Sequence, residues 1–138
     1  MFKKVKGLIA APYTPIKNNG EIDLNKISLY AEKLKKDSLS GVFVCGTTGE
    51  GMFLTNNERK KIAEEWVKYQ SDDFKIIVHV GTTSVVQSSD LANHAQKIGA
   101  FGTSSIGPIF LKPNDINDII DFCKIIADNA PEIPFYYY

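Results

Sequence analysis

Short apolar runs alternate along this chain with longer stretches of helical periodicity, and this alternation constrains the fold more than any other feature. The apolar runs occupy residues 8–11, 42–45, 76–80, 102–106 and 133–138. Between them, apolar residues recur at spacings of three and four, which places them on one face of a helix. Four strand–helix units followed by a fifth strand predict parallel strands with right-handed crossovers. The expected fold class is therefore α/β.

The four predicted helices carry apolar stripes and recognisable end signals. The stripes are Leu24, Ile27, Tyr30, Ala31 and Leu34; Ile62, Ala63, Trp66 and Val67; Leu91, Ala92, Ala95 and Ile98; and Ile116, Ile119, Ile120, Cys123 and Ile126. The predicted end signals are Asp23 capping the first helix, a Thr55-x-x-Glu58 capping box, a Ser84-x-x-Gln87 capping box, and Gly99 closing the third helix.

Two architectures fit this element order. An open, doubly wound sheet of five strands would be complete at 138 residues, whereas a (β/α)₈ TIM barrel of roughly 250 residues would be only partly present. The chain ends at Tyr138, inside the last predicted strand. We therefore expect residues 1–138 to form the N-terminal half of a TIM barrel, with strands six to eight absent.

Composition narrows the classes of partner. Sixteen basic and sixteen acidic residues give zero formal net charge, which argues against nucleic acid and membrane surfaces as partners. Cys45 and Cys123 form no C-x-x-C pair, and both are expected to be inert, buried thiols. The apolar run before Pro12 is too short for a signal peptide. We expect a cytoplasmic protein that needs no metal or other cofactor.

A glycine-rich loop, Gly46-Thr47-Thr48-Gly49-Glu50-Gly51, directly follows the second predicted strand. Its spacing matches neither a Walker loop nor a dinucleotide-binding fingerprint. Glycines allow the backbone to approach a ligand closely, and the two threonines add hydroxyl groups. The loop therefore suits a carboxylate or a phosphate, although an ordinary glycine-rich turn remains the alternative at this point.

Four motifs, each at the end of a predicted strand, indicate a family. They are Pro12-Tyr13-Thr14-Pro15, the glycine-rich loop, Phe110-Leu111-Lys112-Pro113 and the Tyr136-Tyr137-Tyr138 run. With them the chain resembles, over its whole length, the N-terminal half of the pyruvate-dependent class I aldolases, the family of N-acetylneuraminate lyase and dihydrodipicolinate synthase. The resemblance implies a barrel that is usually tetrameric and a Schiff base between pyruvate and a lysine beyond the fifth strand.

The same resemblance assigns roles to three residues. Thr47 and Thr48 would bind the carboxylate of a 2-keto acid, and Tyr138 would move protons as the catalytic residue. The lyase subgroup fits better than the synthase, because synthases carry a proton-relaying tyrosine where this chain has Phe110. The implied reaction is the reversible cleavage of N-acetylneuraminate to pyruvate and N-acetylmannosamine, with the 138-residue chain itself inactive.

Three alternatives stay open. They are a dihydrodipicolinate synthase or another 2-keto acid aldolase, a non-enzymatic α/β domain that binds phosphate, and a remnant that assembles with another half-barrel.

Five other residues are given structural roles. His79 is expected to be a hydrogen-bonded core histidine, His94 a surface residue and Trp66 part of the core. Glu50 is expected to bind backbone N–H groups of the following turn. Lys112 is expected to be an exposed loop residue, which a Schiff-base lysine would not be.

Overall fold

Five parallel strands form a single sheet whose spatial order follows the sequence, β1-β2-β3-β4-β5. The computed structural model describes residues 4–138, so the first three residues of the expected domain lie outside the described part. The strands are β1 (Ile9–Ala10), β2 (Gly41–Val44), β3 (Lys75–His79), β4 (Gly102–Ser105) and β5 (Phe135–Tyr137). The helices are α1 (Asn25–Lys36), α2 (Asn56–Val67), α3 (Val85–Lys97) and α4 (Ile116–Ala127), with a 3-10 turn η1 (Gly51–Phe53) before α2.

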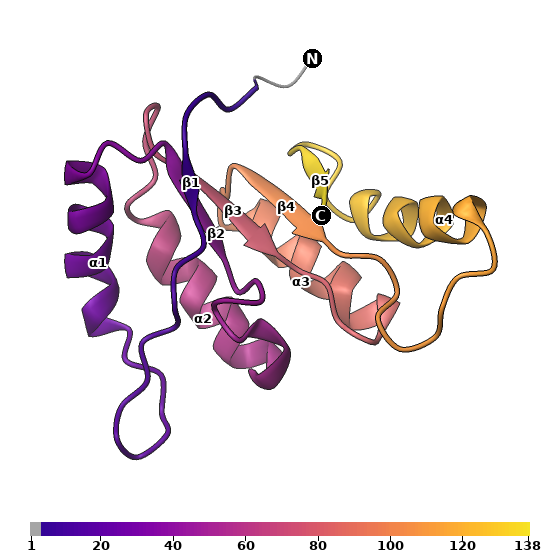
Figure 1. Cartoon of the computed structure of the whole chain (residues 1–138), viewed down its shortest axis with the longest axis horizontal. Coiled ribbons are helices and arrows are strands. Elements are labelled where there is room, and N and C mark those ends of the chain that lie inside the picture. The colour runs from indigo at the N-terminus through magenta and orange to yellow at the C-terminus, as the bar shows by residue number, and fades with distance from the viewer. Residues whose placement is uncertain (1–3) are drawn as a thin grey trace.

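The strand order decides between the two expected architectures. When parallel neighbours are joined in sequence order by right-handed crossovers, every helix falls on the same face of the sheet. Figure 1 shows this: the four helices lie along one side of the sheet. A doubly wound sheet has helices on both faces, so that alternative is wrong. The chain is α/β and corresponds to the N-terminal part of a TIM barrel.

The core lies between this helical layer and the sheet. Alternate residues of β2 and β3, such as Val42, Val44 and Val78, are buried against the helices. The predicted stripes of the first three helices supply the other side, with Trp66 only 1% exposed. Because a strand alternates sides, Phe43 and His79 point to the opposite face, which would be the inside of a barrel.

Two of the predicted helix end signals are confirmed. Thr55 and Glu58 form a complete capping box at the start of α2. At the end of α3, Gly99 has φ +81°, and the N–H groups of Gly99 and Ala100 donate to the carbonyls of Gln96 and Ala95. This is a Schellman motif, and it needs a residue that tolerates the left-handed region.

Two other end signals differ from expectation. Asp23 does not cap α1, since the capping position is Leu24 and no side chain bonds there. Ser84 accepts from the Gln87 backbone N–H, but its own N–H donates to the Thr82 hydroxyl at 2.9 Å. That N–H is therefore not available to the Gln87 side chain, and only half of the predicted box forms.

The chain termini and α4 also depart from the predicted pattern. β1 and β5 are shorter than the apolar runs that contain them, and Tyr138 lies just beyond β5. Of the α4 stripe only Ile126 is fully buried, while Ile116 and Ile120 are 64% and 50% exposed. Within residues 4–138, no element covers this part of the helix.

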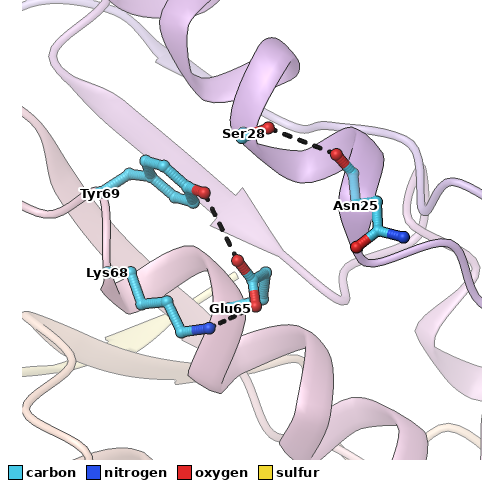
Figure 2. Close-up of polar contacts among 5 residues, drawn as sticks. All are labelled: Asn25, Ser28, Glu65, Lys68 and Tyr69. Carbon is cyan, nitrogen blue, oxygen red and sulfur yellow. Dashed lines mark hydrogen bonds and ion pairs between the residues drawn. The ribbon is translucent and has the colours of Figure 1, made fainter.

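Several polar side chains of the helical layer form contacts near helix ends, away from the open face of the sheet. At the end of α2, the Glu65 carboxylate accepts from Lys68 Nζ at 2.6 Å and from the Tyr69 hydroxyl at 3.4 Å, as Figure 2 shows. In α1, the Ser28 hydroxyl donates to the Asn25 carbonyl at 3.3 Å. Exposed pairs of this kind contribute at most about 1 kcal/mol, so they fix side chains more than they stabilise the fold.

Candidate active site

A cavity of about 250 Å³ lies at the open face of the sheet, near the carboxyl ends of β1, β2 and β5. Its walls contain all three residues that the sequence singled out, Thr47, Thr48 and Tyr138. Thr47 and Thr48 are 90 positions or more before Tyr138, and only the parallel sheet brings them together. Ligand sites of parallel α/β folds lie at this end of the strands.

The loop that carries the two threonines is tightly folded. Cys45, immediately before the loop, and Glu50, its fifth residue, have positive φ angles of 58° and 53°, a conformation that costs a non-glycine residue about 1 kcal/mol or more. Gly51 is required by sterics, since a Cβ there would lie 1.9 Å from the Cys45 carbonyl oxygen. The backbone N–H of Gly51 closes the loop onto the Gly46 carbonyl at 3.1 Å.

This folding leaves a group of hydrogen-bond donors open to the cavity. Within residues 4–138, neither the hydroxyl groups nor the backbone N–H groups of Thr47 and Thr48 have a protein partner. Thr47 is exposed and Thr48 half-buried. Convergent hydroxyl and N–H donors can bind a carboxylate, because each oxygen accepts more than one hydrogen bond.

Tyr138 faces this cavity from the other side. Its ring centroid lies 5.8 Å from that of Phe43, which also lines the cavity. The preceding Tyr137 lies on the opposite face, where it lines an apolar groove of about 460 Å³ with α4. Alternation along the strand therefore separates the two tyrosines, and only Tyr138 is at the cavity.

The sequence did not identify the apolar wall of the cavity, nor a hydrogen bond that supports the glycine-rich loop. Ile9, Ala11 and Phe43 complete the cavity, and nothing but strand alternation from a known register could have identified them. The Thr14 hydroxyl, in the third position of the motif after β1, donates to the Gly49 carbonyl at 2.6 Å. This bond ties the loop after β1 to the glycine-rich loop.

The structure bears out the core position predicted for His79 and contradicts the prediction for Glu50. His79 is a buried core residue as expected, 5% exposed. Its Nδ1 has no hydrogen-bond partner within residues 4–138, whereas a hydrogen bond to the Cys45 backbone acts to raise its pKa. Burial, aided by the Arg59 charge, lowers the pKa of His79 to about 4. The Glu50 side chain bonds no backbone N–H within residues 4–138; its own backbone N–H donates to the Thr47 carbonyl instead.

The structure agrees more closely with what the sequence predicted for Lys112, His94 and the two cysteines. Lys112 is exposed in its loop, as expected. His94 is half-buried and pairs with Glu64 at 2.8 Å. Cys45 is buried, whereas Cys123 is only half-buried, and burial raises the pKa of both thiols, that of Cys45 to about 11. No helix among the described residues has the length and hydropathy needed to cross a bilayer.

Comparison with curated proteins finds extensive similarity to N-acetylneuraminate lyases. The chain is 46% identical to the human N-acetylneuraminate lyase over 138 residues, which is 99% of this chain and 43% of the human protein. N-acetylneuraminate lyase A of Xenopus laevis is also 46% identical, with 45% of its length covered. The chain thus spans less than half the length of these relatives.

Solved structures give the same result. The N-acetylneuraminate lyase of Aliivibrio salmonicida superposes with a TM-score of 0.94 at 43% identity, covering 99% of this chain and 46% of that one. The dihydrodipicolinate synthase of Aquifex aeolicus reaches 0.88 at 31% identity, covering 96% and 44%. The family model described as "Dihydrodipicolinate synthetase family" matches residues 4–138. The chain belongs to the dihydrodipicolinate synthetase family.

Proposed function

We propose that these 138 residues form part of an N-acetylneuraminate lyase, which cleaves N-acetylneuraminate reversibly to pyruvate and N-acetylmannosamine. The observation that carries the proposal is the cavity lined by Thr47, Thr48 and Tyr138. It combines unpaired donors on one wall with a phenolic hydroxyl on the other, which is what an anionic keto acid undergoing proton transfer requires. The similarity to relatives named N-acetylneuraminate lyase adds support.

In this proposal the loop binds and the tyrosine moves protons. The hydroxyl and N–H groups of Thr47 and Thr48 hold the substrate carboxylate and so fix the position of the neighbouring ketone carbon. A lysine beyond the fifth strand, supplied by the rest of the barrel, forms the Schiff base that withdraws electrons from the breaking carbon–carbon bond. Tyr138 relays the proton of the substrate hydroxyl: it accepts that proton as the carbon–carbon bond breaks, while its own phenolic proton passes to the carbon that becomes the methyl group of pyruvate. Condensation reverses both transfers.

A carboxylate fits the loop better than a phosphate does. Phosphate sites commonly use the free N–H groups of a long helix that starts at the loop. Here the loop runs into the three-residue turn η1, and α2 starts only at Asn56 with its first turn already capped by Thr55 and Glu58. The non-enzymatic phosphate-binding alternative therefore has less support.

The lyase reaction is also preferred over the synthase reaction. The loop after β4 presents Phe110, 84% exposed, where the resemblance leads us to expect a proton-relaying tyrosine in a synthase. A phenyl ring has no proton to transfer. We further propose that the complete protein is a cytoplasmic homotetramer, as the family resemblance implies, which size-exclusion chromatography with light scattering would test.

The test needs a complete barrel, meaning these 138 residues followed by their own downstream sequence or by the matching C-terminal part of the A. salmonicida lyase. Incubation with N-acetylneuraminate should release pyruvate, detected with lactate dehydrogenase, and N-acetylmannosamine, detected by chromatography. Borohydride in the presence of pyruvate should add one reduced pyruvate per chain by intact mass. A complete barrel that condenses pyruvate with aspartate semialdehyde but leaves N-acetylneuraminate intact would overturn the proposal in favour of the synthase.

A further inference from the structure

Arg59 is the only arginine in the sequence, and it is buried. It lies in the first turn of α2, just after the glycine-rich loop, and its side chain is 2% exposed. The guanidinium donates from Nη2 to the His79 carbonyl at 2.7 Å and from Nη1 to the Gly81 carbonyl at 3.0 Å. It thereby fixes the carboxyl end of β3 against α2.

The positive charge of Arg59 is not neutralised. Within residues 4–138 no carboxylate lies within 4.0 Å of it, and its buried Nε has no hydrogen-bond partner. The neighbouring ionisable groups are uncharged at neutral pH, because burial raises the pKa of Cys45 to about 11 and lowers that of His79 to about 4. A buried ion without a counter-ion is costly, and such groups concentrate at functional sites.

The guanidinium lies directly behind the loop that lines the cavity. Its charge acts on the thiol of Cys45, the residue immediately before the loop, where it opposes the effect of burial on the pKa of that thiol. Gly51, the last residue of the loop, packs against the Cys45 carbonyl. Thr47 and Thr48 follow Cys45 by two and three residues, so their backbone lies within about 11 Å of it along the chain. A fixed charge this close, in a site of low dielectric, attracts an anion without touching it.

We propose that Arg59 is a positioning residue of this site: its buried guanidinium holds the loop against β3 and makes the cavity prefer a carboxylate over an uncharged group. This rests on the proposed function, in which Thr47 and Thr48 bind the carboxylate of a 2-keto acid. The two threonines supply the hydrogen bonds, and Arg59 supplies the positive field behind them. Arg59 does not contact the substrate, because the described residues cover it.

The experiment compares charged and uncharged ketones in the complete barrel. Three variants are made: Arg59→Gln, which keeps a donor but loses the charge; Arg59→Lys, which keeps the charge; and Lys60→Gln. Lys60 is the matched control, since it occupies the next position of α2 and pairs at the surface with Asp90 at 2.7 Å. KM and kcat for pyruvate are measured in the condensation direction, together with the inhibition constant of methyl pyruvate, an uncharged ester.

Loss of a charge at this distance should raise the KM for pyruvate about tenfold in Arg59→Gln, with kcat within about threefold. The inhibition constant of methyl pyruvate should stay within about twofold of the parent value, because the ester carries no charge. Arg59→Lys and Lys60→Gln should both keep the preference for pyruvate. If Arg59 had only a structural role, Arg59→Gln would weaken the binding of pyruvate and methyl pyruvate alike.

The proposal is overturned if Arg59→Gln binds both ketones as the parent does, or loses both equally. If Arg59→Gln does not fold, Arg59→Lys decides, since a folded lysine variant that no longer prefers pyruvate would show that charge is not the cause. Failure of the proposed function is distinguishable from either result. In that case the parent barrel itself leaves N-acetylneuraminate intact, whether or not it forms a Schiff base with pyruvate.

Discussion

Replacing Tyr138 by phenylalanine in the complete barrel separates catalysis from folding. Within residues 4–138 the Tyr138 hydroxyl makes no hydrogen bond, and the side chain is 72% exposed. The free energy of unfolding should therefore change by no more than about 0.5 kcal/mol. Removal of a general acid–base group typically lowers kcat by about 10²–10⁴-fold, and we expect a loss in that range.

Tyr137→Phe provides the matched control. It deletes the same atom one residue earlier, but from the face that lines the groove beside α4 rather than the cavity. We expect kcat within about threefold of the parent for this variant. Pyruvate release from N-acetylneuraminate gives kcat, and urea unfolding gives stability. The reasoning is refuted if Tyr137→Phe shows the large loss, or if Tyr138→Phe keeps the parental kcat.

Four further predictions concern the loop, the buried His79 and the isolated chain. In the complete barrel, Thr47→Ala or Thr48→Ala should each lower kcat/KM by roughly ten- to a hundredfold, since one hydrogen bond to a charged group contributes about 1.5–3 kcal/mol; parental kinetics in both would remove the loop from the site. Gly51→Ala should destabilise the protein by about 1–3 kcal/mol in urea unfolding, because its Cβ would overlap the Cys45 carbonyl oxygen; an unchanged midpoint would contradict the steric argument. Folding lowers the pKa of His79 from 6.5 to about 4. Between these pH values the unfolded state binds a proton that the folded state does not, so the free energy of unfolding should fall as the pH drops from 6.5 to about 4. The fall should be smaller in His79→Gln. The 138-residue chain alone should gain no mass from pyruvate and borohydride, and a stoichiometric adduct on Lys112 would show that it carries its own Schiff-base lysine.

Much of the fold follows from local patterns in the sequence. The periodicities placed all four helices and all five strands, since each depends on residues close in sequence. The Thr55–Glu58 box and Gly99 were readable because capping uses residues within one turn. Asp23 failed as a cap because the capping position is Leu24, where no side chain bonds. Gln87 failed to complete its box because the Ser84 N–H donates to the neighbouring Thr82 hydroxyl.

The sequence by itself supplied the residues of the candidate site, but not its geometry. It marked Thr47, Thr48 and Tyr138 through motifs at strand ends. Only the tertiary structure decided that these residues share one cavity, because their proximity depends on the order of the strands, which periodicity does not encode. The same holds for Arg59, which reads as one more charged residue of an amphipathic helix. Its burial and its missing counter-ion depend on how α2 packs against the ends of β2 and β3, a long-range arrangement that no local pattern specifies.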